Sequence, residues 1–167
     1  MIVRGVCVTH AREDVAIRKL EELPEQIHAL RAQAVAEGFR FLTRLISEWD
    51  NRTNRFDQPG ECLFGVFRHG QLIGVGGVSC DPYAGPGVGR LRRVYIAPSL
   101  RGQAIGKALV KRLLEHAAAH FQEARLTTDT PQAAQFYLRC GFQRIDNDHA
   151  THVTSLIALK ARASKSP

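Results

Sequence analysis

The segment from Val94 to Lys107 constrains the fold of this chain more than any other. Strand-like residues lead up to Pro98, a short loop containing Gly102 follows, and an amphipathic helix begins with no spare residues. A strand that feeds a helix in this way predicts a domain built from layers of sheet and helix. It also predicts an anion site, because the first N–H groups of a helix are unpaired and carry the positive end of its dipole.

Hydrophobic periodicity predicts the remaining elements. Strands are expected over residues 15–20, 62–69, 71–79, 90–97, 124–128, 142–145 and 152–160, and helices from Pro24 and over 41–49, 102–121 and 131–139. His69-Gly70 is a tight-turn signal, so the second and third strands are expected to form an antiparallel hairpin. This order predicts an α/β (α+β) fold, a mixed sheet with helices on both faces.

The length of 167 residues fits one domain with a single core. We expect that domain over residues 15–160, after an N-terminal strand or arm at residues 1–14 and before a flexible polar tail at residues 161–167. A homodimer formed through residues 2–8 or through the last strand is compatible with the sequence.

The net charge of +7 fits a polyanionic partner, either a nucleic acid or a phosphorylated cofactor. The basic residues are spread along the chain, without a nucleic-acid motif and with few aromatic residues to stack on bases. We therefore expect no nucleic-acid partner.

The four cysteines lie far apart and form no CxxC pair, so neither a disulfide framework nor a metal site is expected. No apolar run approaches the roughly 20 residues of a membrane span, and the first residues do not form a signal peptide. The prediction is a cytoplasmic protein without a membrane partner.

The loop after the strand at 90–97 resembles the acetyl-CoA-binding segment of the GNAT (Gcn5-related N-acetyltransferase) superfamily. The family pattern is Arg or Gln, two residues, Gly, one residue, and then Gly or Ala. Arg101 and Gly106 match it, and Ala104 replaces the middle glycine. The resemblance implies that this loop holds the CoA pyrophosphate. Its expected cofactor-binding residues are Arg101, Gly102, Gln103, Ala104, Ile105, Gly106 and Lys107.

A second segment, Thr130 to Phe142, resembles the family's helix that ends in a Phe-Tyr pair and is followed by Gly-Phe. The resemblance implies that Thr130, where an asparagine is common in the family, and Phe136 contact the cofactor. It also implies that Tyr137 is the general acid, donating a hydrogen bond to the departing thiolate. A phenol pKa of about 10 lies above the thiol value of about 8.5, so a hydrogen bond describes this role better than complete proton transfer.

The resemblance further implies a mostly antiparallel sheet of about seven strands in which two central parallel strands splay apart. These would be the strand ending at Ile96 and the strand over 124–128, with the pantetheine arm of CoA between them. Main-chain groups of Val94, Tyr95 and Ile96 would then bind the pantetheine and polarise the thioester carbonyl.

The implied activity is that of an acetyl-CoA-dependent N-acetyltransferase. The acetyl group would pass to the amine of a small molecule or peptide by direct attack in a ternary complex. Many relatives carry a glutamate on the strand before the loop, but here that strand has arginines at 90, 92 and 93. These arginines are either a solvated strand face or a contact for an acidic part of the acceptor or the cofactor's phosphates.

Asp81 ranks first as the candidate general base, ahead of Glu48 and Asp50, and a relay of waters competes with all three. Two other functions stay open, a transferase of a longer acyl group and a non-catalytic sensor or interaction module that binds acyl-CoA.

Overall fold

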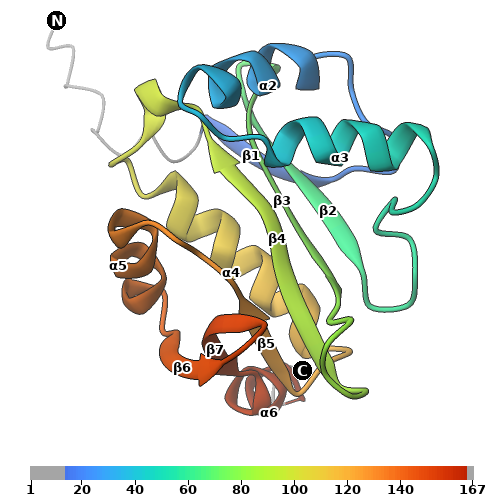
Figure 1. Cartoon of the computed structure of the whole chain (residues 1–167), viewed down its shortest axis with the longest axis vertical. Coiled ribbons are helices and arrows are strands. Elements are labelled where there is room, and N and C mark those ends of the chain that lie inside the picture. Colours follow the sequence, from blue (N-terminus) through green and yellow to red (C-terminus); the bar gives the residue numbers. More distant parts are fainter. Residues whose placement is uncertain (1–13, 165–167) are drawn as a thin grey trace, which may run out of the picture.

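The structure is a computed structural model that describes residues 14–164 (Figure 1). Seven strands and six helical segments follow one another in an order that confirms the predicted alternation and adds a helix at the end. They are β1 (Val15–Lys19), α2 (Ile27–Ala36), α3 (Phe41–Asp50), β2 (Cys62–Arg68), β3 (Gln71–Cys80), β4 (Val88–Ile96), the 3-10 turn η1 (Pro98–Leu100), α4 (Ile105–Ala118), β5 (Glu123–Leu126), α5 (Pro131–Arg139), β6 (Gln143–Asn147), β7 (Ala150–Ser155) and α6 (Ile157–Ser164).

The strands form one sheet in the order β1-β2-β3-β4-β5-β7-β6. Every neighbouring pair is antiparallel except β4 and β5, which are parallel. The two parallel strands pair only over Val88–Arg90 and Glu123–Arg125, so residues 91–96 of β4 have no partner on β5. The sheet is therefore mixed and mostly antiparallel, and its two central strands part halfway along β4, as predicted.

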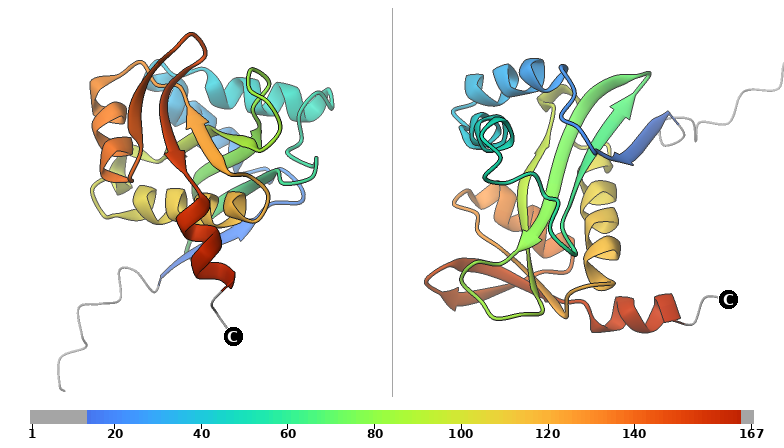
Figure 2. Two further views of the ribbon diagram at one scale, coloured as in Figure 1. Left: turned by 90° about the horizontal axis from the view of Figure 1, so that it is seen from below. Right: turned by 90° about the vertical axis from the view of Figure 1, so that its right-hand side faces the viewer.

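Helices cover both faces of the sheet, α4 on one face and α2 with α3 on the other (Figure 2). Alternate residues of the strands feed two separate cores. Phe64 and Val66 of β2 pack with Leu109 and Leu113 of α4. The second core, under α2 and α3, is formed by residues that include Leu30, Leu42, Leu45, Trp49, Leu63, Val75 and Tyr95.

The C-terminal region differs from the sequence prediction. The last strand was expected to run to Lys160, but β7 ends at Ser155 and α6 begins at Ile157. Leu156 is completely buried, and its N–H donates to the carbonyl of Gln122, which continues the β5–β7 pairing by one residue before the helix begins. The following sequence is rich in alanine, a strong helix former, so the segment from Ile157 becomes a helix that extends into the predicted tail as far as Ser164.

The edges of the sheet are β1 and β6. Because β7 is paired on both sides, by β5 and by β6, the last strand offers no free edge to a homodimer. The strand or arm predicted at residues 2–8 lies outside the described residues.

Candidate active site

A β-bulge lies in β4 at the point where this strand has left β5. Val75 of β3 pairs with Tyr95, and Gly77 pairs with Arg92, so one residue of β3 faces two residues of β4, Arg93 and Val94. Arg93 has a φ of 59°, in the left-handed region that non-glycine residues rarely adopt. A bulge interrupts the regular ladder and leaves the extra residue unpaired. Residues 91–96 of β4 also have no partner on β5, so main-chain groups around Val94 are available to a ligand between these two strands.

The loop before α4 presents a row of unpaired backbone donors. Among the described residues, no backbone N–H from Gly102 to Lys107 has an acceptor. Gly102 and Ala104 have φ values of 80° and 63°, which delays the start of the helix to Ile105, later than the predicted residue 102. Successive free N–H groups at a helix N-terminus form an anion site. The residues present therefore fit a diphosphate.

The two sequence motifs meet in space. A methyl group added at Gly106 on α4 would approach the ring carbons of Phe136 on α5 to 3.3 and 3.4 Å. The start of α4 thus packs closely against α5, and a side chain larger than that of glycine would press on the Phe136 ring.

Tyr137 follows on the same helix. Its ring makes edge contacts with Phe136 at 5.0 Å and with Phe142 at 5.6 Å between ring centroids. Its hydroxyl group makes no hydrogen bond within residues 14–164. Burial raises the pKa of Tyr137 well above that of a free phenol, so the group stays protonated and can donate a hydrogen bond.

The geometry described above agrees with the comparisons to known proteins. Residues 15–142 match the model of the acetyltransferase (GNAT) family. The chain belongs to this family. It is therefore an acetyltransferase, and two relatives are also named as N-acetyltransferases.

An uncharacterized N-acetyltransferase of Schizosaccharomyces pombe is 25% identical over 122 residues, covering 71% of this chain and 74% of that protein. YjgM, an uncharacterized N-acetyltransferase of Escherichia coli, is 28% identical over 94 residues, covering 54% of this chain and 56% of YjgM. Among solved structures, a protein of Exiguobacterium assigned to the acetyltransferases has a TM-score of 0.79 at 25% identity, covering 91% of this chain and 99% of that one.

The side chain of Arg101 is engaged within the acetyltransferase itself. Its two terminal nitrogens donate to the two oxygens of Glu37 at 2.6 and 2.8 Å, and its Nε donates to the carbonyl of Ile96 at 3.1 Å. The hydroxyl of Tyr95 donates to the same carboxylate at 2.5 Å. The hydrogen bond from Arg101 lowers the pKa of Glu37. Glu37 thus offsets the charge of Arg101, and the main-chain N–H groups of the loop are left as its unpaired donors.

Three further predicted cofactor residues have side-chain roles in the protein. The Tyr95 ring is buried in the core under α2 and α3, so only its main chain is available to a ligand. Thr130 is the N-cap of α5, and its hydroxyl accepts from the N–H of Ala133 at 3.2 Å. The side-chain oxygen of Gln103 accepts from Arg68 at 3.4 Å.

Asp81, the first candidate base, is 6% exposed and forms an ion pair of 3.2 Å with Arg90. It also accepts from the N–H of Tyr83 at 2.8 Å, while Arg90 donates to the hydroxyl of Thr127 at 2.6 Å. Protonating Asp81 would leave Arg90 buried without its counterion. This environment favours a structural role for Asp81.

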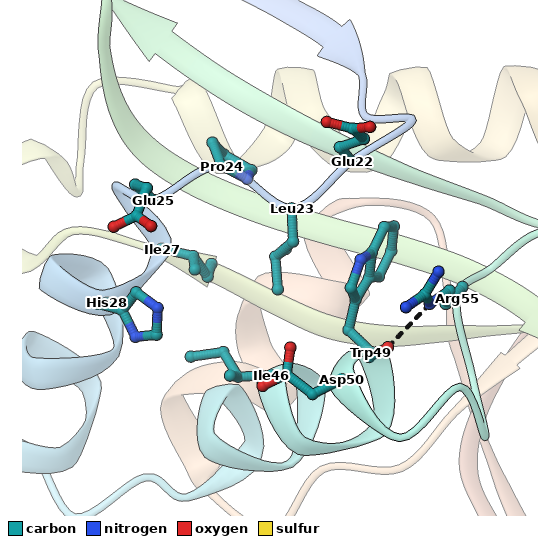
Figure 3. A pocket seen from close by; sticks show the side chains of 10 residues that line it. All are labelled: Glu22, Leu23, Pro24, Glu25, Ile27, His28, Ile46, Trp49, Asp50 and Arg55. Atoms are coloured by element: carbon teal, nitrogen blue, oxygen red, sulfur yellow. Dashed lines mark hydrogen bonds between the residues drawn. The ribbon is translucent and has the colours of Figure 1, made fainter.

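The other two candidate bases lie on α3. Glu48 accepts from Arg93 through both carboxylate oxygens at 3.2 Å. Asp50 lines a pocket of about 380 Å³ between the connection from β1 to α2 and the end of α3 (Figure 3). That pocket also contains Glu22, Glu25 and Trp49, but none of the predicted cofactor residues. No candidate base is therefore both free of an ion pair and placed beside the loop.

Glu37 was not predicted from the sequence, because it lies outside both motifs and 64 positions from its partner Arg101. No group of three or more potential metal-ligating side chains gathers within residues 14–164. In the same part of the chain, no helix has the length and apolar character needed to cross a membrane.

Proposed function

We propose that this acetyltransferase transfers the acetyl group of acetyl-CoA to the nitrogen of an amine by direct attack in a ternary complex. The observation that carries the proposal is the row of unpaired N–H groups from Gly102 to Lys107, adjacent to the gap between β4 and β5. The GNAT family uses acetyl-CoA. A variant of the AtaT toxin, known in complex with the C-terminus of its antitoxin AtaR and acetyl-CoA, shares the fold with a TM-score of 0.66 at 16% identity.

In this proposal the loop fixes the cofactor and β4 orients its reactive end. Donors from Gly102 to Lys107 bind the diphosphate, with charge added by Lys107. Phe136 packs beside them, and main-chain groups of Val94 and Ile96 pair with the pantetheine. A bulge N–H near Val94 then donates to the thioester oxygen, a contribution worth about 3 kcal/mol where comparable donors have been removed from other enzymes.

The reaction requires that two protons be handled. The amine nitrogen attacks the thioester carbon, the C–S bond breaks, and the amine loses a proton while the CoA sulfur leaves as a thiolate. The protonated hydroxyl of Tyr137 donates a hydrogen bond to that sulfur. Because Asp81 and Glu48 are held in ion pairs, a relay of waters to solvent is the proposed path for the amine proton.

The test is a thiol-release assay with acetyl-CoA and a library of amines, paired with calorimetric measurement of CoA binding. Gly106→Val places methyl groups against Phe136 and Ile96 at the start of α4, whereas the matched control Gly85→Val enters open space. We expect Gly106→Val to weaken CoA binding at least about tenfold while the control leaves it unchanged. CoA binding without thiol release for any amine would instead support the non-catalytic sensor, and release only with longer acyl-CoA esters would support the other alternative.

A further inference from the structure

Three arginines of β4 differ in how their charges are balanced. Arg90 is paired with Asp81, and Arg93 is paired with Glu48. Arg92 lies between them, half-buried, and forms no ion pair or hydrogen bond within residues 14–164. The cluster therefore contains three guanidinium groups and two carboxylates, a net charge of +1, and Glu48, the carboxylate whose charge acts on Arg92, is already paired with Arg93.

The position of Arg92 places it beside the proposed reaction centre. Leu91 and Val94 both pack in the core under α4, so Arg92, which follows Leu91, projects to the opposite face, where α3 lies. Val94 is two residues further along β4. At about 3.3 Å per strand residue, the Arg92 side chain is long enough to reach a group bound near the bulge.

The electrostatics of the cluster favour an added anion. The pKa of Arg92 is lowered first by burial and then by the positive charges of Arg93 and Arg90, which together outweigh the opposite effects of Glu48 and Tyr83. The Nε of Arg93 is also buried without an acceptor among the described residues, so donors in the cluster outnumber acceptors. An anion beside Arg92 would offset both the desolvation and the repulsion.

An exposed aromatic side chain, Tyr83, lies next to the same cluster. The ring of Tyr83 stacks on His149 with centroids 4.0 Å apart and planes 8° apart, and the Arg90 guanidinium lies 5.6 Å from the Tyr83 centroid. Tyr83 is 58% exposed, and its hydroxyl group acts electrostatically on Arg92. Aromatic surface and a free guanidinium together suit a ligand with both an apolar part and a charge.

We propose that Arg92 binds an anionic group, a carboxylate or a phosphate, carried by the acceptor amine. The proposal rests on the proposed function, since it names the class of acceptor that the acetyltransferase uses. The planar guanidinium matches both anions through two parallel N–H···O bonds. A polycationic amine is disfavoured, because it would approach an uncompensated positive charge.

The pyrophosphate is not the anion assigned to Arg92. The unpaired donors of the 102–107 loop begin beyond Ile96, at the far end of β4 and past η1. Arg101, the arginine of that loop, is already paired with Glu37. The two anion sites therefore lie in different parts of the chain.

The experiment compares matched amines in the thiol-release assay, glycine with glycinamide and aminoethyl phosphate with ethanolamine, and includes spermidine as the cationic extreme. The proteins are wild type, Arg92→Gln, Arg92→Lys and, as the control, Arg44→Gln, which changes an exposed arginine on α3. We expect wild type to prefer one or both anionic members, and Arg92→Gln to lower kcat/KM for them about 10- to 100-fold through KM. Glycinamide and ethanolamine should be unaffected, Arg92→Lys should retain part of the preference, and Arg44→Gln should behave as wild type.

A second readout separates this proposal from the proposed function. The melting temperature is measured for each protein with CoA and with each anionic amine, because a bound ligand stabilises the fold without turnover. Stabilisation by glycine or aminoethyl phosphate that is lost in Arg92→Gln supports the anion site even if no thiol is released. A wild-type preference for spermidine or the neutral amines overturns the proposal, as does stabilisation that is the same in Arg92→Gln. Weaker CoA binding in Arg92→Gln would overturn it too, by making the cofactor the occupant.

Discussion

The middle of β4 and the loop that leads into α4 offer a ligand two different kinds of group. Beyond Ile96, the loop at 102–107 offers main-chain N–H groups, and its arginine is occupied by Glu37. Around residues 90–93, three guanidinium groups instead gather with the carboxylates of Asp81 and Glu48. Main-chain donors suit a ligand shared by a whole family, since any sequence with the right turn supplies them. Side-chain charges suit a ligand that differs from one member to the next.

The largest effect that tests this difference is expected when a charge is removed from the arginine cluster. Asp81→Ala leaves Arg90 buried without its counterion, and we expect a loss of about 3–5 kcal/mol in the free energy of unfolding. Urea denaturation followed by circular dichroism measures this value. The control is Asp57→Ala, which removes an exposed carboxylate that accepts a hydrogen bond from its neighbour Gln58 at 3.4 Å. An unchanged unfolding midpoint combined with a large loss of kcat would assign Asp81 to proton transfer.

The second prediction concerns the cofactor side. Tyr137→Phe removes a hydroxyl that has no partner in the described part of the chain, so neither stability nor CoA affinity should change by more than about 0.5 kcal/mol. If the hydroxyl stabilises the leaving thiolate, kcat should fall about 100-fold. Steady-state kinetics and calorimetry on the same preparation separate the two effects. A loss of CoA affinity as large as the loss of kcat would make Tyr137 a packing residue.

A smaller effect tests whether the main-chain conformation of the loop at 102–107, rather than its side chains, determines its stability. Ala104 is in the left-handed region, where a Cβ is costly, so Ala104→Gly should raise the free energy of unfolding by about 0.5–1 kcal/mol. Ala108→Gly makes the same change inside α4 and should lower stability by about 1 kcal/mol. Thermal melts of the two variants measure whether their stabilities change in opposite directions. Equal destabilisation by both variants would show that the Ala104 methyl group contributes packing.

The smallest effect concerns β7, on the far side of the gap. Burial, and then the charge of Arg144, lower the pKa of His152, whose Nδ1 lies 2.8 Å from the hydroxyl of Thr151. Between the lowered native pKa and the unfolded value of about 6.5, the unfolded chain binds the proton and the native state does not. Stability should therefore be complete above that pH and decline as the pH falls below it. Urea midpoints from pH 7.5 to 5.0 should show this decline, and His152→Gln should flatten it. A slope that His152→Gln leaves unchanged would point to His116, whose pKa burial also lowers.

Much of the fold was predictable because its periodicity is unambiguous. The hairpin at His69-Gly70 and the amphipathic character of α4 are confirmed. Ile27, Leu30, Ala34 and Val35 recur at helical spacing, which predicts one buried face, and the first three are buried in α2. Val35, placed with that group by spacing alone, is 51% exposed. The prediction of a strand after Leu156 was wrong. A short run of alternating apolar residues is compatible with both a strand and a helix, and here the helix propensity of alanine decides between them.

The candidate site was predictable only where residues adjacent in sequence form it. The loop at 102–107 is one continuous segment, so its donors follow from its position before a helix. Glu37 and Arg101 are brought together only by the packing of α2 against the sheet. The same holds for Asp81 with Arg90 and for the unpaired state of Arg92, because charge balance depends on neighbours that local patterns do not specify.

The ion pair between Glu37 and Arg101 has a consequence for the order of events in catalysis. It attaches the end of α2 to the segment that is proposed to receive the donor nucleotide, so tightening of one would be transmitted to the other. Thermodynamic coupling of this kind acts equally in both directions. Loading of the donor and selection of the acceptor would then be cooperative rather than independent.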